Sequence, residues 1–218
     1  MESENFKLPD SQVNHVCRVL RMREGDEFLA YNKATGEWLC RINKIHKCCI
    51  TATRICCKRK YVEFRRIALG ICQIKPENMK LVIEKCTELG ATDFYMLDSK
   101  YTNYNNNIEK LRRIAILASD QSERLDVPGI HSPETLDKFT AHLPEKYTWY
   151  TALERAPDAH QWKEITNSDV GFIIGPEGGF SATEREILCQ KTTPISLSRN
   201  ILRSETAAIL CTAIAGML

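Results

Sequence analysis

The stretch IIGPEGGFSATEREI, residues 173–187, joins a short apolar run to a charged segment through a turn that holds three of the chain's ten glycines. The apolar run 170–175 has the length of a buried strand and ends in a glycine. Ser181 followed by Glu184 is the pattern of a capping box, in which two side chains satisfy the first backbone amides of a helix. The stretch therefore predicts a strand, a turn and a helix in succession.

Segments of the same two kinds alternate on both sides of this stretch. Apolar runs of strand length lie at 67–74, 93–98, 147–153, 170–175 and 194–198. Apolar residues at helical spacing lie at 77–90, 106–124, 181–190 and 204–218. Such alternation predicts an α/β domain with a mostly parallel sheet covered by helices. The segment 125–144 contains three prolines and is interpreted as a connection.

The first third of the chain has a different pattern. Strand-sized runs of mixed alternation predict a small β-barrel or sheet at 25–32, 36–45 and 48–57. A helix is predicted for 14–23, with Val16, Val19 and Leu20 on one side. The change of pattern predicts two domains, at residues 1–64 and 65–218.

Charge is distributed unevenly, although the formal net charge is only +2. Residues 1–66 carry 14 Lys and Arg against 8 Asp and Glu, whereas residues 67–218 carry 16 against 20. Clustered cations with few acids predict contact with a phosphate backbone, and a solvated basic face is the alternative. The candidate RNA-binding residues are Arg18, Arg21, Arg23, Lys58, Arg59, Lys60, Arg65 and Arg66.

Ten cysteines are many for 218 residues, yet none form Cys-x-x-Cys and none have zinc-like spacing with a histidine. We interpret them as small apolar residues in a reducing cytoplasm, with a metal or redox site as the alternative. No apolar run approaches the length of a membrane span, and the acidic start MESENFKLPD lacks the apolar part of a secretion signal. We therefore expect a cytoplasmic protein with no metal and no membrane partner.

The glycine turn falls where ligands bind in open α/β sheets, at the carboxyl end of a strand. Its glycines let the backbone approach a ligand, but it has neither the Gly-Lys-Ser/Thr of a phosphate loop nor Gly-x-Gly-x-x-Gly. Glu177 disfavours an anion and favours a ligand with hydroxyls, an amine or a positive centre. A plain tight turn is the alternative.

The stretch LSRNILRSETAAIL, residues 197–210, adds a second candidate loop before the last helix. Ile201 and Leu202 are apolar residues in a loop, so they need cover from a flat ring or from the chain itself. Arg203 stands beside the start of the helix, which is the unfavourable end for a cation. The alternative for Arg203 is an ion pair with one of two carboxylates, Glu205 or Glu177, and Glu205 also suits the helix dipole.

Taken together, these motifs resemble the RsmE family, methyltransferases of small-subunit ribosomal RNA in the SPOUT, or α/β-knot, superfamily. The specific part of the resemblance is GPEGGFS followed by an acidic helix, together with L-x-x-x-ILR-S-ETA. The segments NHVCRVLRMREGDEF, MKLVIEKCTELGATDFYML and ASDQSER support it, so the resemblance covers most of the chain.

The resemblance implies an N-terminal PUA-like RNA-binding β-barrel, a C-terminal α/β trefoil-knot (SPOUT) methyltransferase domain and a homodimer. It implies S-adenosylmethionine as methyl donor and 16S rRNA of the small ribosomal subunit as partner, with N3 of uracil 1498 as the target. The cofactor-binding residues that it implies are Glu154, Ile174, Gly175, Pro176, Glu177, Gly178, Gly179, Leu197, Ser198, Ile201, Leu202, Arg203, Thr206 and Ala207.

Three residues are expected to act in catalysis. Removing the N3 proton of uracil leaves negative charge on the ring oxygens, which Arg203 is expected to stabilise. Glu205 or Glu177 is expected to accept the proton, directly or through water.

The chain departs from the family's pattern in two places within the second loop. Ser198 replaces a glycine, and Asn200 replaces an arginine whose charge Arg199 could supply instead. The family usually has an additional N-terminal strand that carries an arginine, and this sequence does not show that strand clearly. A knotted methyltransferase acting on another RNA, and a non-catalytic RNA-binding or ribosome-assembly factor, are the alternatives.

Overall fold

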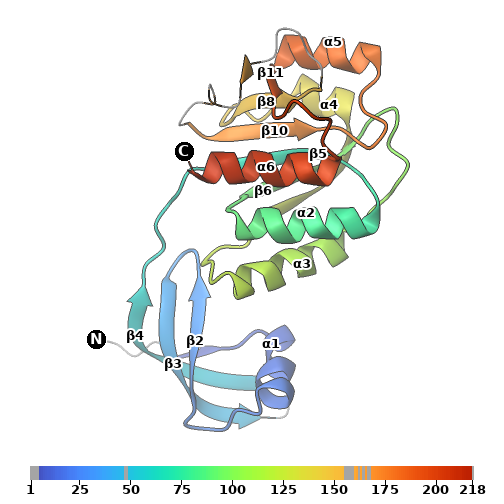
Figure 1. The fold of residues 1–218 in the computed structure, drawn as a ribbon. Helices are drawn as coiled ribbons and strands as arrows, with labels where there is room; N and C mark the ends of the chain where they lie inside the picture. Colours follow the sequence, from blue (N-terminus) through green and yellow to red (C-terminus); the bar gives the residue numbers. More distant parts are fainter. Residues whose placement is uncertain are drawn as a thin grey trace. The chain divides into compact units, whose positions relative to one another are not determined.

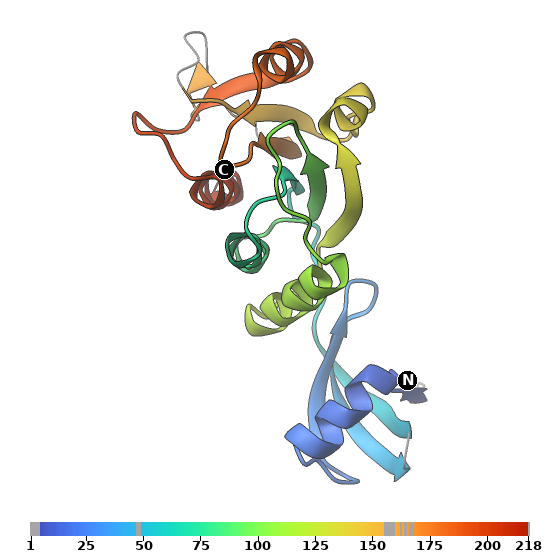
Figure 2. The same ribbon diagram turned by 90° about the vertical axis from the view of Figure 1, so that its right-hand side faces the viewer.

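A computed structural model describes residues 5–46, 49–154, 160–161, 163, 165 and 168–217. The chain forms two compact units, residues 1–63 and 64–218 (Figures 1 and 2). The division lies one residue before the boundary expected from the sequence. No described helix is long and apolar enough to cross a membrane.

The first unit is an antiparallel sheet with a short helical segment packed on it (Figure 1). Its strands are β1 (Asn5–Lys7), β2 (Glu27–Asn32), β3 (Gly36–His46) and β4 (Cys49–Arg59), in the spatial order β1-β4-β3-β2. β1 was not predicted, and it pairs with β4 through Asn5 and Thr53. The described strands therefore confirm the expectation of a small β domain.

The helical segment lies earlier than the sequence predicted. It consists of α1 (Asp10–Asn14) followed by the π-helical turn η1 (His15–Val19), so it ends four residues before the expected Arg23. Val16 is buried, but Val19 and Leu20 are 65% and 53% exposed, so the three residues predicted to lie on one side of the helix do not share a buried face. The buried face is formed instead by Val13 and Val16, which are three residues apart.

The second unit contains a sheet in which every described strand pair is parallel. Its strands are β5 (Ile67–Cys72), β6 (Asp93–Asp98), β7 (Gly129–Thr135), β8 (Thr148–Ala152), β9 (His160–Gln161), β10 (Val170–Ile174) and β11 (Thr193–Ser196), in the spatial order β7-β6-β5-β10-β8-β11-β9. Its helices are α2 (Pro76–Glu88), α3 (Ile108–Gln121), α4 (Leu136–Ala141), α5 (Ala182–Lys191) and α6 (Ser204–Met217). The predicted alternation of strands and helices is confirmed.

Helices cover both faces of this sheet, and each face has its own apolar core (Figures 1 and 2). Because successive strand side chains point to opposite faces, Ile67, Leu69 and Ile71 pack with α2, α3 and α6. The intervening Ala68 and Cys72 pack in the other core, which includes residues of α4 and α5. Strands buried on both faces explain why these runs are continuously apolar.

The interpretation of 125–144 as a plain connection was wrong. This segment contains the edge strand β7 and helix α4, whose Leu136 and Phe139 are buried in the second core. Pro133 concealed the strand, because proline normally argues against a strand and is tolerated chiefly at a sheet edge. The edge position of β7 therefore accounts for the missed element.

The cysteines are divided between the interior and the surface. Among the described cysteines, Cys40, Cys72, Cys86 and Cys211 are buried, and none is in a disulfide. Burial raises the pKa of Cys72 and Cys86 to about 12, so both remain neutral thiols at physiological pH. The described residues contain no group of three or more His, Cys, Asp or Glu side chains arranged to hold a metal ion.

Candidate functional site

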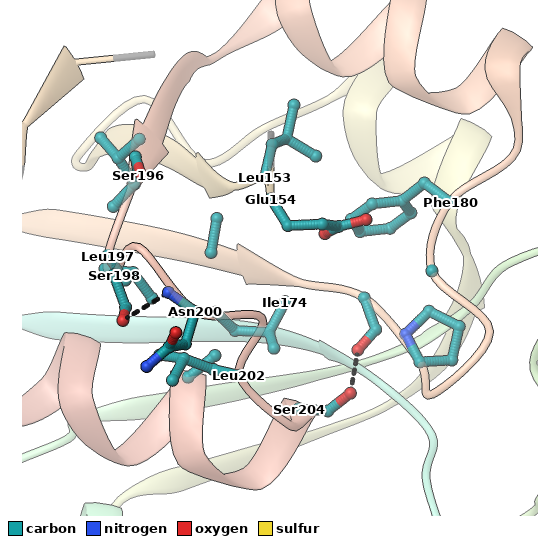
Figure 3. A pocket seen from close by; sticks show the side chains of 16 residues that line it. Leu153, Glu154, Ile174, Phe180, Ser196, Leu197, Ser198, Asn200, Leu202 and Ser204 are labelled. Atoms are coloured by element: carbon teal, nitrogen blue, oxygen red, sulfur yellow. Dashed lines mark hydrogen bonds between the residues drawn. The ribbon is translucent and has the colours of Figure 1, made fainter. Parts of the chain in front are cut away.

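A pocket lies at the carboxyl ends of β8, β10 and β11, beside the first turn of α6 (Figure 3). The space between its lining residues, including the part open to solvent, is about 560 Å³. The residues that line it are Ala152, Leu153, Glu154, Ile174, Gly175, Pro176, Gly179, Phe180, Ile195, Ser196, Leu197, Ser198, Asn200, Leu202, Ser204 and Ala207. The pocket thus combines the two loops that the sequence singled out.

The glycine turn forms one wall of the pocket. A side chain at position 175 would bring its Cβ to 3.0 Å from the Phe180 ring, so glycine lets the turn pack closely against that ring without displacing it. Gly179 has a φ of +70°, a conformation that glycine adopts without strain, and its N–H donates to the Pro176 carbonyl at 2.9 Å. These contacts define a tight turn that presents backbone to the pocket.

Helix α5 begins immediately after the turn with the predicted capping box. The Ser181 Oγ accepts from the Glu184 N–H at 3.4 Å, and the Glu184 carboxylate accepts from the Ser181 N–H at 2.8 Å. The predicted helix start is therefore confirmed.

Glu184 also connects the turn to a second loop. Its Oε1 accepts a hydrogen bond from the backbone N–H of Lys100, in the loop after β6, at 2.7 Å. Burial alone would raise the pKa of this carboxyl, but the hydrogen bonds from Lys100 and Ser181 outweigh burial and lower its pKa. The ionised carboxylate therefore holds two loops together at the carboxyl edge of the sheet.

The loop before α6 forms the opposite wall (Figure 3). The Ser204 Oγ donates to the Gly175 carbonyl at 2.7 Å, which fixes the start of α6 against the glycine turn. Ser198, the residue in place of a glycine, accepts from the Asn200 N–H at 3.1 Å. Leu202 lines the pocket and is partly covered by the main core, whereas Ile201 is 61% exposed. The protein core therefore shields Leu202 in part from solvent, whereas Ile201 remains exposed.

Glu154, two residues beyond β8, is the only charged residue among the described residues that line the pocket. Its Oε1 accepts from the Arg185 guanidinium of α5 at 3.1 Å, and its backbone carbonyl accepts from the same guanidinium at 2.8 Å. The preceding Leu153 donates its N–H to the Ile195 carbonyl at 3.1 Å. Leu153 and Glu154 are therefore held by hydrogen bonds from two elements, β11 and α5.

Most of the residues expected to bind a cofactor line this pocket. Those that do are Glu154, Ile174, Gly175, Pro176, Gly179, Leu197, Ser198, Leu202 and Ala207. Those outside the lining are Glu177, Gly178, Ile201, Arg203 and Thr206. The lining residues that sequence reasoning missed are Ala152, Leu153, Phe180, Ile195, Ser196, Asn200 and Ser204. Several of these end β8 or β11 or directly follow β8, so the carboxyl-end rule applied to every strand would have found them.

The three candidate catalytic residues differ in their surroundings. Arg203 is exposed, and its guanidinium forms no hydrogen bond or ion pair with any described residue. The alternative of an ion pair with Glu205 or Glu177 is therefore not observed. Glu205 is only 8% exposed, and its Oε2 has no hydrogen-bond partner among the described residues. Glu177 is exposed and accepts from the backbone N–H of Lys75 at the start of α2, at 3.3 Å.

The candidate RNA-binding cations fall into two groups. Six are exposed in the first unit, namely Arg18, Arg21, Arg23, Lys58, Arg59 and Lys60, although Arg59 also pairs with Glu37 at 3.4 Å. Arg65 instead donates to the carbonyls of Ser168 and Ala215, and Arg66 donates its N–H to Asp169. These two residues have structural contacts within the second unit.

A further basic residue of the first unit, Arg54, was not among the candidate RNA-binding residues. The Arg54 guanidinium lies over the rings of Phe6 and Trp38, at 5.7 Å and 5.4 Å from their centroids. Cations interleaved with aromatic side chains are common on surfaces that bind nucleic acid. The signal in the sequence was weak, because the three residues lie on three different strands.

The chain is similar to known RNA methyltransferases over most of its length. A family model described as an RNA methyltransferase domain matches residues 62–216, and one described as an RNA methyltransferase PUA domain matches residues 8–51. Ribosomal RNA small subunit methyltransferase E of Rickettsia conorii is 34% identical to this chain over 216 residues, which cover 95% of this chain and 88% of the relative.

Two solved structures share the fold over nearly the whole chain. A putative methyltransferase from Legionella pneumophila, in complex with the cofactor SAM, has a TM-score of 0.84 and 26% identity, covering 99% of this chain and 92% of that one. A ribosomal RNA small subunit methyltransferase E from Neisseria gonorrhoeae, bound to S-adenosyl methionine, has a TM-score of 0.86 and 24% identity, covering 99% and 91%. The predicted fold, a PUA domain followed by a SPOUT-like methyltransferase domain, is confirmed.

Proposed function

We propose that this chain, which belongs to the ribosomal RNA small subunit methyltransferase E family, methylates N3 of one uridine in 16S ribosomal RNA. The observation that supports this most is the pocket itself. Both family loops, the glycine turn and the segment before α6, converge on it from separate parts of the chain. Uracil 1498 is the target that the family resemblance implies.

The pocket suits S-adenosylmethionine, the methyl donor. The absent Cβ atoms of Gly175 and Gly179 leave backbone bare along one wall, and Leu197 and Leu202 offer apolar surface for an adenine ring on the other. Glu154 supplies a carboxylate that would attract the ammonium group of the methionine part. When bound, this cofactor supplies a methyl group on a positively charged sulfur.

The residues of the chain supply position and charge rather than covalent chemistry. Holding the reacting atoms near attack distance can lower the activation free energy by roughly 7–11 kcal/mol. Arg203 is free of described partners, so its guanidinium is available to the negative charge that develops on the uracil oxygens. We assign it that role.

Two carboxylates are candidates for accepting the N3 proton. Glu205 is favoured by its buried Oε2, because a buried oxygen without a donor is expected to acquire one when substrate binds. Glu177 is exposed and already accepts from a backbone amide, so it is the weaker candidate. We therefore place Glu205 first as proton acceptor.

Several properties of the family complete the proposal. The basic surface of the PUA domain docks on phosphates of the small subunit's RNA, whose folded shape matters as much as its sequence. The second unit is knotted at the glycine turn and the loop before α6, and two chains form a homodimer. The protein acts in the cytoplasm and requires no metal.

The proposal is tested by methyl transfer from labelled S-adenosylmethionine to purified small ribosomal subunits, with large subunits as the control. We expect label in the 16S RNA of small subunits alone. Cofactor binding without transfer to small subunits would point to another RNA, whereas a protein that binds RNA but no cofactor would be an assembly factor.

A further inference from the structure

Arg185 contacts Glu154 through two acceptors at once. Its guanidinium donates one hydrogen bond to the Glu154 carboxylate at 3.1 Å and another to the Glu154 backbone carbonyl at 2.8 Å. A planar guanidinium presents its donors in a fixed fork, so one Arg185 rotamer constrains both the main chain and the side chain of Glu154. A lysine could not make this pair of contacts with the same geometry.

The contact leaves part of the carboxylate free for the pocket. Arg185 occupies Oε1, whereas Oε2 has no hydrogen-bond partner among the described residues. Figure 3 shows the Glu154 side chain pointing in the direction of Phe180, which also lines the pocket. The free oxygen is thus available to a ligand.

Stability alone does not account for this arrangement. The two side chains are 32% and 43% exposed, and ion pairs at such exposure contribute little to folding. The two described residues that directly follow β8, Leu153 and Glu154, belong to no helix or strand. Arg185 lies on helix α5, which follows the glycine turn, and its contacts hold Glu154 in place.

We infer that Arg185 is a positioning residue, which holds the Glu154 carboxylate so that it binds the ammonium group at the amino-acid end of S-adenosylmethionine. The inference rests on the proposed cofactor pocket and adds to it a residue that neither touches the reacting atoms nor lines the pocket. Preorganising a binding group in this way raises affinity by reducing the ordering needed upon binding.

Three probes separate this role from a general structural one. S-adenosylmethionine carries both the ammonium and the sulfonium, S-adenosylhomocysteine carries the ammonium alone, and 5′-methylthioadenosine carries neither. We expect Arg185→Ala to lower the affinity for S-adenosylmethionine and for S-adenosylhomocysteine about tenfold, the loss expected for a charge-assisted contact. The affinity for 5′-methylthioadenosine should fall less than about twofold. Arg185→Lys should fall between Arg185→Ala and the wild type. Lys191→Ala, which removes another cation from α5, should change none of the three affinities.

A double-mutant cycle gives a second readout. Glu154→Gln should lower the affinity for the same two ammonium-bearing probes. Arg185→Ala should lower that affinity much less in the Glu154→Gln variant than in the wild type. Equal losses for all three probes, no loss for any probe, or additive effects in the double variant would overturn the inference. The titrations contain no RNA, so a protein that binds all three probes but methylates no uridine would contradict the proposed function and leave this inference standing.

Discussion

The Glu184 carboxylate accepts a hydrogen bond at 2.7 Å from the backbone N–H of Lys100, which precedes it by 84 residues in the chain. The same carboxylate caps α5 through Ser181. One buried side chain thus fixes the loop after β6 to the turn that lines the pocket. Its position links the stability of the second unit to the shape of the site.

Glu184→Gln should therefore weaken both folding and cofactor binding. The amide keeps the size of the side chain but replaces an anionic acceptor with a neutral one and adds N–H groups that face other donors. We expect a loss of about 1–3 kcal/mol in the free energy of unfolding, measured by urea titration. Titration with S-adenosylmethionine should show reduced affinity. Wild-type stability in this variant would show that the link between the loops is unimportant.

Asp93 provides a matched test of a partly buried carboxylate at the amino ends of the strands, opposite the pocket. Its carboxylate accepts from the Tyr147 hydroxyl and lies 2.9 Å from the His131 ring, with Lys146 at 3.7 Å. Burial would raise the pKa of Asp93, but the contacts with His131, Tyr147 and Lys146 lower it. Its contribution to stability is therefore complete above the unfolded-state pKa of about 3.9 and is lost as the pH falls through the lower folded-state value.

Asp93→Asn should lower the free energy of unfolding at neutral pH by about 1–3 kcal/mol and flatten its decline below about pH 4. The affinity for S-adenosylmethionine should stay the same, because Asp93 lies at the amino end of β6, away from the pocket lining. Urea titrations across pH measure the first effect and calorimetry the second. An unchanged acid slope would mean that the Asp93 cluster does not couple protonation to folding.

Arg203→Ala should reduce methyl transfer by about 10²–10³-fold, the cost of losing one group that stabilises a developing anion. Cofactor affinity should be unchanged, because Arg203 does not line the pocket. Single-turnover transfer to small subunits measures the first quantity and calorimetry the second. Arg203→Lys keeps the charge and should recover part of the rate. A wild-type rate for Arg203→Ala would remove the residue from the mechanism.

Ser198→Gly tests the departure in the second loop. The substitution restores the glycine of the family pattern but removes the hydroxyl that accepts from the Asn200 N–H. Because one such hydrogen bond is worth about 0.5–1.5 kcal/mol, we expect cofactor affinity to fall about two- to tenfold. Ser198→Ala should behave in the same way, since it also lacks the hydroxyl. Tighter binding by Ser198→Gly would show instead that the serine strains the loop.

The sequence predicted those features that depend on neighbouring residues. The capping box of Ser181 and Glu184 needs only residues three apart, and the alternating elements of the second unit follow from local periodicity. It did not predict the bond from Lys100 to Glu184, because nothing local relates two residues 84 positions apart. The contact between Arg185 and Glu154 was missed for the same reason.

Errors arose where local patterns were ambiguous. Val19 and Leu20 have helical spacing with Val16, but the helix ends at Val19 and these residues remain exposed. Pro133 concealed an edge strand, and Leu136 with Phe139 gave too short a pattern to identify α4. The family motifs located most of the pocket lining, since they cover both loops that form it. Residues at the ends of β8 and β11 were missed because the carboxyl-end rule was applied to the strand before the glycine turn alone.

The most direct test of the central claim is the position of the transferred methyl group in 16S ribosomal RNA. Small ribosomal subunits would be treated with the protein and isotope-labelled S-adenosylmethionine, and the RNA digested to nucleosides and fragments for mass spectrometry. The account predicts labelled 3-methyluridine at a single position, formed about 10²–10³-fold more slowly with Arg203→Ala under the same conditions. Label on another base, on a ribose or on many uridines would contradict it.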